Sequence, residues 1–217
     1  MAEIVRYATP VFRLSFPALY KAESYDGGEP KFGCSAVWDP AKFTDKEKLL
    51  WKKIRGAMND ECKARFRKGI KDMPSNFKDG IRDGAEKADM EGYGKGTKFA
   101  SLTTKMRPGL VDVAKRSIVT PDDVKMIEKF EEQDKPYVID EGDIIYPGLY
   151  ARATVVVYSY DNKSKGVSLG LMNLQKVKDG ERLDSRSDAA EDFDDDYLED
   201  DDDNLLDDDG LDDEDDL

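Results

Sequence analysis

Two stretches near the start of the chain are predicted to be β-strands, the first because it alternates between apolar and polar residues. In residues 4–20, every second residue from Ala8 to Phe16 is apolar, and the two prolines of this stretch indicate a sheet edge or strand ends. Residues 31–38 form the second stretch and follow a glycine-rich turn. The chain therefore opens with two predicted strands.

A change to four-residue spacing predicts a long helix. Thr44 and Glu47 have the spacing of a capping box. Apolar residues then recur at intervals of four: Leu50, Ile54, Met58, Cys62, Phe66 and Ile70. The other faces of this helix are basic and carry Lys48, Lys52, Lys53, Arg55, Lys63, Arg65, Arg67 and Lys68. These cations form either a solvated surface or a binding surface, and the sequence leaves both open.

The middle of the chain is less regular. Residues 72–97 are rich in glycine and charge, and their loop at 92–96 lacks the spacing of a phosphate-binding P-loop. Residues 98–107 predict a further strand, one side of which is a candidate nucleic-acid face: Phe99, Ser101, Thr103, Lys105 and Arg107. A short second helix is predicted between Thr120 and Glu132.

The clearest hairpin lies in the last third of the chain. After a Tyr-Pro-Gly turn, residues 149–160 alternate, with small apolar residues on one face. The opposite face carries Tyr150, Arg152, Tyr158 and Tyr160. The turn that follows adds Lys163 and Lys165, and residues 167–174 supply the return strand.

Charge is divided unevenly along the chain. The chain has 34 basic and 48 acidic residues, a net charge of −14, but residues 184–217 hold 20 of the acidic residues and a single basic one, Arg186. This segment alone carries −19, and residues 1–183 carry +5. Because the segment has too few apolar groups to offset chain entropy, we predict a disordered acidic tail after one domain at residues 1–183.

Composition excludes several kinds of chemistry. The chain has no histidine, which excludes histidine-based triads and mixed cysteine–histidine zinc sites. Cys34 and Cys62 lack C-x-x-C spacing and are expected to be buried free thiols in a reducing cytosol. No apolar run approaches the roughly 20 residues of a membrane span, and the N-terminus lacks a signal peptide's apolar region. We expect a soluble cytoplasmic protein that uses no cofactor or metal.

Binding of single-stranded nucleic acid requires cations along the phosphates and flat side chains on which unpaired bases stack. The hairpin offers both, in Tyr150, Arg152, Tyr158, Tyr160, Lys163 and Lys165. Candidates from other strands are Arg13, Trp38, Phe99, Lys105 and Arg107. We therefore predict a surface for single-stranded DNA, although each tyrosine alone is also typical of a half-buried structural position.

Several segments resemble the single-stranded DNA-binding proteins of tailed bacteriophages. They are residues 10–16 (Pro-Val-Phe-Arg-Leu-Ser-Phe), 32–38, 146–153 (Tyr-Pro-Gly-Leu-Tyr-Ala-Arg-Ala), 158–160, 166–177 and 179–183. The resemblance implies a mainly β OB-fold, a five-stranded Greek-key barrel with one long helix and extended loops. It also implies sequence-independent binding of single-stranded DNA in phage replication and recombination, with the residues named above lining the groove. Such a protein is not an enzyme. We expect a monomer or small homo-oligomer.

The acidic tail has two interpretations. A tethered segment reaches roughly millimolar effective concentration at its own domain, so it would compete with DNA for a basic groove and, once displaced, recruit phage or host replication proteins. Alternatively, it only raises solubility. The chain ends in Leu217, whereas many tails of the resembling proteins end in an aromatic residue.

Two other classes of function remain open. Asp140, Glu141 and Asp143 are the densest acidic cluster of residues 1–183, and carboxylates alone can hold Mg²⁺ for a nuclease. They lie in a predicted loop without partner carboxylates, where solvated charge is the simpler interpretation. The other class is a protein-interaction module or nucleic-acid mimic, and the +5 charge of residues 1–183 argues against a pure mimic.

Overall fold

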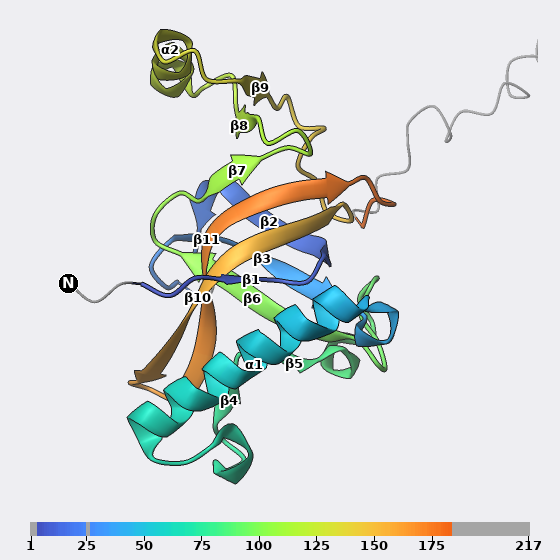
Figure 1. Ribbon diagram of the computed structural model, residues 1–217, viewed down its shortest axis with the longest axis vertical. Coiled ribbons are helices and arrows are strands. Elements are labelled where there is room, and N and C mark those ends of the chain that lie inside the picture. Colours follow the sequence, from blue (N-terminus) through green and yellow to red (C-terminus); the bar gives the residue numbers. More distant parts are fainter. Residues whose placement is uncertain (1–3, 25–26, 184–217) are drawn as a thin grey trace, which may run out of the picture. The chain divides into compact units, whose positions relative to one another are not determined.

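A computed structural model describes residues 4–24 and 27–183 (Figure 1). Its strands are β1 (Tyr7–Ala8), β2 (Phe12–Glu23), β3 (Lys31–Trp38), β4 (Lys78–Asp79), β5 (Arg82–Asp83), β6 (Lys98–Thr104), β7 (Gly109–Val111), β8 (Ser117–Val119), β9 (Tyr137–Ile139), β10 (Tyr150–Asp161) and β11 (Lys165–Lys178). Its helices are α1 (Asp45–Phe66) and α2 (Val124–Glu132), with short 3-10 helices η1 (Pro40–Lys42), η2 (Ile70–Asp72) and η3 (Gly84–Lys87). The prediction of a mainly β protein with one long helix is confirmed. The predicted acidic tail lies outside the described residues.

Five strands pair in a closed ring, in the order β2, β3, β6, β11, β10 and back to β2. Neighbours in the ring are antiparallel except β6 and β11, which run parallel. The long β10–β11 hairpin closes the ring, and Figure 1 shows both of its strands arching past β2, β3 and β6. The ring therefore places two sequence-distant parts of the chain, β2–β3 and β10–β11, side by side.

Helix α1 begins with the predicted capping box. The Thr44 hydroxyl accepts a hydrogen bond from the Glu47 backbone N–H at 3.3 Å, and the Glu47 carboxylate accepts one from the Thr44 backbone N–H at 3.0 Å. The helix packs against β1, β10 and β11. It ends at Phe66, four residues before Ile70, because Arg67 adopts the left-handed conformation (φ 62°) that closes a helix. Neither described helix is long and apolar enough to cross a membrane.

The core includes an aromatic cluster centred on Trp38. This side chain is 1% exposed, and its ring lies 5.7 Å from Phe12 and 5.2 Å from Trp51, measured between ring centroids. Its indole N–H donates to the Pro10 carbonyl at 3.3 Å. The prediction that Trp38 contacts DNA is therefore wrong, because both the ring and its one donor are used inside the protein.

Cys34 and Cys62 are buried free thiols, as predicted. Burial raises the pKa of the Cys34 thiol to about 12, so the reactive thiolate is suppressed at neutral pH.

Residues 108–145, called the arm below, carry β7, β8, α2 and β9 at one end of the ring (Figure 1). Two polar contacts join the arm to the preceding strands. Arg107 makes a two-pronged ion pair with Asp123, and its guanidinium lies 5.7 Å from the ring centroid of Tyr20. The Tyr20 hydroxyl in turn donates to the carboxylate of Asp140. The arm is thus anchored through a partly buried charged network.

Replacing Arg107 with glutamine should destabilise the protein by about 1.5–3 kcal/mol, because Asp123 would lose a charged hydrogen-bond partner. The hydrogen bonds from Arg107 hold the pKa of Asp123 at about 2, below the usual 3.8. Because the pKa of Asp123 is lower in the folded than in the unfolded protein, the stabilisation by the Arg107–Asp123 ion pair is complete above pH about 4. It is lost as the pH falls towards 2.

Urea unfolding at pH 7, 4 and 2.5 checks this prediction. The Arg107→Gln variant should lose less stability than the parent protein between pH 4 and 2.5. Lys129→Gln, an exposed change on α2, serves as the control and should keep the parent's pH dependence. If Arg107→Gln also keeps it, the ion pair is not the source of the acid-sensitive stability.

Candidate nucleic-acid interface

A cleft of about 570 Å³ crosses the outer face of β2, β3 and β6. Residues of these strands line it together with residues of the β2–β3 loop and of the segment that contains η3; they include Phe16, Gly28, Glu29, Lys31, Phe32, Lys87, Met90, Ser101 and Thr103. The cleft therefore combines aromatic rings with cations, the two groups that a single strand requires.

Phe16 points into this cleft because β2 contains a bulge. The pairing of β2 with β3 moves from Ser15 opposite Ser35 to Ala18 opposite Gly33, so β2 has one more residue than its partner. Phe16 takes a left-handed backbone conformation, with φ 47°, and its side chain is 49% exposed. A bulky residue in this conformation is strained, and such strain is typical of functional sites.

The bulge reverses the side-chain direction that the sequence pattern predicts for Phe16. Strict alternation places Phe16 on the same side as Leu14, which is buried in the core. The extra residue reverses this, and the available signal was Pro17, because proline within a strand often marks a bulge.

Cations reach the cleft from the glycine-rich segment. The Lys87 ammonium lies 5.3 Å from the ring centroid of Phe16 and 5.2 Å from that of Phe99. The guanidinium of Arg82 lies 4.4 Å from the Phe99 centroid, and the Tyr93 ring packs edge-on at 5.3 Å. Phe99 is consequently 0% exposed, and the prediction that it contacts bases is wrong. Lys87 lines the cleft at this position, and Phe99 does not.

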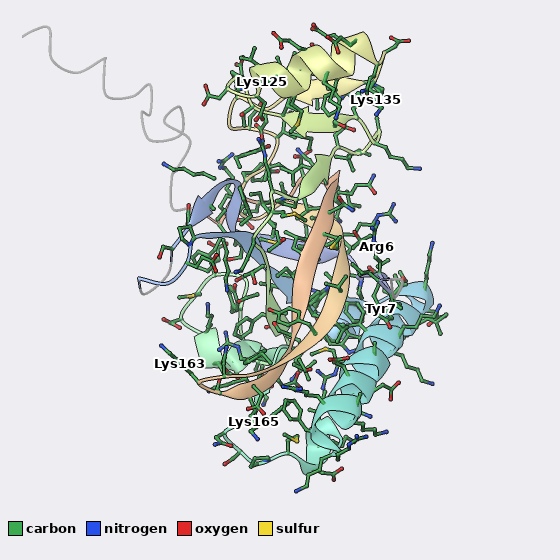
Figure 2. All side chains as sticks on the ribbon, turned by 90° about the vertical axis from the view of Figure 1, so that its left-hand side faces the viewer. Arg6, Tyr7, Lys125, Lys135, Lys163 and Lys165 are labelled. Carbon is green, nitrogen blue, oxygen red and sulfur yellow. The ribbon has the colours of Figure 1, made fainter. Side chains whose placement is uncertain are left out.

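The predicted hairpin residues separate into two groups. Tyr150 and Tyr158 lie eight residues apart on β10, which is roughly 26 Å along a strand. At the far end, Tyr158 is 39% exposed, and its ring centroid lies 6.4 Å from that of the half-buried Tyr160. Lys163 and Lys165 extend from the adjoining turn, as Figure 2 shows.

Tyr150 and Arg152 belong to the other group. The Lys178 ammonium covers the Tyr150 ring at 4.4 Å from its centroid, and Arg152 donates to the Gln175 side chain at 2.8 Å. Tyr150 and Arg13 are paired across β10 and β2 and line a second cleft of about 360 Å³. The structure thus brings Arg13 to Tyr150 but keeps both apart from Tyr158.

Four predicted cations already have acidic partners, and one of them, Lys165, lies 3.6 Å from the Asp161 carboxylate. Arg13 donates to the Glu181 carbonyl at 3.0 Å and lies within ion-pair distance of Glu91 and the Glu181 carboxylate. Lys105 pairs with Glu29 at 2.7 Å, and the hydrogen bond from Lys105 lowers the pKa of that carboxyl group. Lys105 remains exposed beside the first cleft, whereas Arg107 is held by Asp123 as an anchor of the arm.

The acidic loop considered for a nuclease has a structural role. Asp140 is 3% exposed, and its carboxylate accepts the Tyr20 hydroxyl and the backbone N–H groups of Gly142, Asp143, Ile144 and Ile145. Burial alone would raise its pKa, but these hydrogen bonds outweigh burial and lower it. Within residues 4–24 and 27–183, no group of three His, Cys, Asp or Glu side chains could hold a metal ion.

Comparison with known proteins identifies the family. The sequence model described as "Enterobacter phage Enc34, ssDNA-binding protein" matches residues 5–206, which is most of the chain. The chain belongs to this family of phage single-stranded DNA-binding proteins. The resemblance seen in the sequence is confirmed.

Two further proteins are similar to this chain. "Putative protein p50" of Acyrthosiphon pisum secondary endosymbiont phage 1 is 28% identical over 200 residues, covering 84% of this chain and 89% of that protein. The solved single-stranded DNA-binding protein of bacteriophage Enc34 in complex with single-stranded DNA has a TM-score of 0.62 at 22% identity, over 82% of this chain and 89% of its own.

A C-terminal truncation of that phage protein gives a TM-score of 0.60 at 21% identity, over 82% and 88% of the two chains. The chain thus shares its overall fold with the single-stranded DNA-binding protein of bacteriophage Enc34.

Proposed function

We propose that this family member binds single-stranded DNA without sequence preference, and that the strand lies in the cleft across β2, β3 and β6. Phe16 is the observation that carries the proposal. Its exposed ring stands on a strained bulge, with the Lys87 ammonium 5.3 Å from its centroid. A base can stack on such a ring whatever its identity, because every base has a flat π-face, and the ammonium can neutralise a phosphate.

The strand order supports an OB-fold as the basis of this site. If the ring strands are counted along the chain, their order is first, second, third, fifth and fourth, with the third and fifth parallel. OB-folds bind oligonucleotides on the face of the second and third strands and with the loops after the first and fourth strands. Here the cleft lies on β3 and β6, Glu29 comes from the first of these loops, and Lys163 lies in the other.

The same proposal covers the biological role. A protein that coats single strands without reading their sequence suits phage replication and recombination in the host cytoplasm, and it needs no catalytic group or cofactor. We further propose that residues 184–217, with 20 carboxylates, compete with DNA for the cleft and, when displaced, recruit replication proteins of the phage or host. The positive charge of residues 1–183 supports this competition.

Titration of a fluorescein-labelled oligonucleotide, followed by anisotropy, tests the proposed function. An oligo-dT and a mixed-sequence strand of ~20 nucleotides should bind alike, and both more tightly than the matching duplex, because paired bases cannot stack on Phe16. Strong preference for one sequence, or no binding to either strand, would refute it.

Replacing Tyr158 and Tyr160 together with alanine should weaken binding of a ~20-nucleotide strand by about tenfold, with little change in the salt slope. The loss is moderate because only Tyr158 offers a well-exposed ring, and stacking releases few counterions. Phenylalanine at both positions is the control, because it keeps the rings. If the phenylalanine variant loses as much affinity as the alanine variant, the hydroxyls rather than the rings are responsible.

A further inference from the structure

The C-terminal end of α1 meets the tip of the β10–β11 hairpin and brings together cations that lie outside the cleft. We call this group the basic end; it consists of Lys63, Arg65, Lys68, Lys71, Lys163 and Lys165, all exposed. Two contacts establish that the segments adjoin. The Lys165 ammonium lies 5.9 Å from the ring centroid of Phe66 in the last turn of α1, and Lys78, which follows that turn, pairs with Gly166.

Most members of the basic end form no ion pair with the described residues. Within the described part of the chain, Lys165 is the only member of the basic end that forms an ion pair, with Asp161 at 3.6 Å. Arg55, earlier on the same helix, differs from these cations because it makes a two-pronged ion pair with Asp79. Clustered cations repel one another in the free protein, and a bound polyanion would relieve that repulsion.

A line of cationic and aromatic side chains connects the basic end to the cleft. Lys87 stands beside Phe16 in the cleft, and both Lys87 and Arg82 lie against the Phe99 ring. Arg82 follows shortly after β4, whose Lys78 pairs with Gly166 in the hairpin. Tyr160 pairs with Gly166 at the hairpin tip, next to Lys165.

We propose that a single strand longer than the cleft continues past Tyr160 and the hairpin tip onto the basic end, where its phosphates contact the cations of α1. This inference rests on the proposed function and extends its site. Lysine and arginine on an exposed helix end are suited to phosphates rather than bases, because phosphate contacts carry no sequence information and need no stacking platform. The basic helix face noted in the sequence is thereby a binding surface at its C-terminal end.

A charge-matched pair of variants tests the proposal. The first is Lys63→Gln, Lys68→Gln and Lys71→Gln in the basic end. The control removes the same charge from exposed positions on the arm: Lys125→Gln, Lys129→Gln and Lys135→Gln. Figure 2 shows Lys125 and Lys135 at the end of the protein opposite to Lys163 and Lys165. Both variants are made in the full chain, and unfolding midpoints confirm that each is folded.

Binding is measured with strands of ~6 and ~20 nucleotides, since site sizes of single OB-folds run from about 4 to 16 nucleotides. For the basic-end variant, the ~20-nucleotide strand should bind about tenfold more weakly near 0.1 M salt. The slope of log affinity against log salt should fall by about 2, at roughly 0.7 for each phosphate that no longer has a cation beside it. The ~6-nucleotide strand should bind as it does to the parent protein. The arm variant should match the parent with both strands.

Three results would overturn the inference. Equal losses in the basic-end and arm variants would show only a long-range charge effect. Equal losses with both strand lengths would show that the basic end does not act as an extension of the cleft. Tighter binding by the basic-end variant would mean that this surface holds a competing acidic segment. Failure of the proposed function is distinct, because the parent protein would then bind neither strand.

Discussion

Replacing Phe16 with alanine and Lys87 with glutamine together should weaken binding of a ~20-nucleotide single strand by about 100-fold. Removing one stacking platform costs about 1–3 kcal/mol per base, and each phosphate left without its cation reduces the salt slope by about 0.7. Both side chains face the same cleft, with the Lys87 ammonium 5.3 Å from the Phe16 ring centroid. Anisotropy titrations between about 0.05 and 0.3 M salt would measure the affinity and its salt slope together.

Leu49→Ala with Lys52→Gln is the matched control. It also removes one exposed apolar side chain, 56% exposed, and one exposed lysine, but from α1 outside the cleft. This variant should bind DNA as the parent does. A comparable loss in the control would show that the effect comes from general charge or surface changes, and an unaffected Phe16/Lys87 variant would remove the cleft from the binding site.

Because the Phe16 backbone is strained, a glycine variant can separate the effect on DNA binding from the effect on stability. Because Phe16 has φ 47°, Phe16→Gly should keep or raise the free energy of unfolding, whereas it removes the stacking ring. Glycine at this position should therefore bind DNA as weakly as alanine in a protein that is no less stable. A large fall in stability would indicate that Phe16 serves the fold rather than the ligand.

Truncation after residue 183 should raise affinity for single-stranded DNA by about tenfold to 100-fold at low salt and make the salt dependence steeper. The removed segment carries −19, and a tethered competitor acts at roughly millimolar effective concentration. Added salt weakens the competitor as well as the DNA, which flattens the response of the full chain. Without the competitor, salt acts on the DNA contacts alone.

A full-length chain in which the 20 acidic residues of this segment are changed to asparagine and glutamine is the control for length. It should behave like the truncated protein, because charge rather than bulk blocks the cleft. Equal affinities of the parent and truncated proteins across the salt range would favour the alternative that the segment only improves solubility.

Local sequence patterns predicted the elements well where the pattern alone decides the structure. The spacing of four and the capping box indicated the start of α1, and the strand predicted at residues 31–38 matches the bounds of β3. The hairpin strands also form where predicted, with Ala151, Ala153 and Val155 on the buried face of β10. Helical and extended periodicities are set by backbone geometry within a few residues, so they can be read from the chain.

The same reasoning failed for two site residues and missed the ion pair of a third. Trp38 lies on the core face of β3, where Trp51 of α1 packs against it, whereas Phe99 lies on the opposite face of the sheet beneath Arg82 and Lys87. In both cases the covering segment is remote in sequence. Arg107 is neutralised by Asp123, 16 residues further along. Alternation shows which residues share a face, but not what covers that face or which cation already has a partner.

The sequence by itself determined the mainly β character, the long capped helix, the division between a basic domain and an acidic segment, and the resemblance to phage single-stranded DNA-binding proteins. Tertiary structure alone decided which aromatic rings are exposed at the cleft. The bulge that exposes Phe16 exists only in the pairing of β2 with β3, and Lys87 reaches that ring only when residues 72–97 fold over β6. Local periodicity cannot specify either arrangement, because both depend on contacts between segments far apart in the chain.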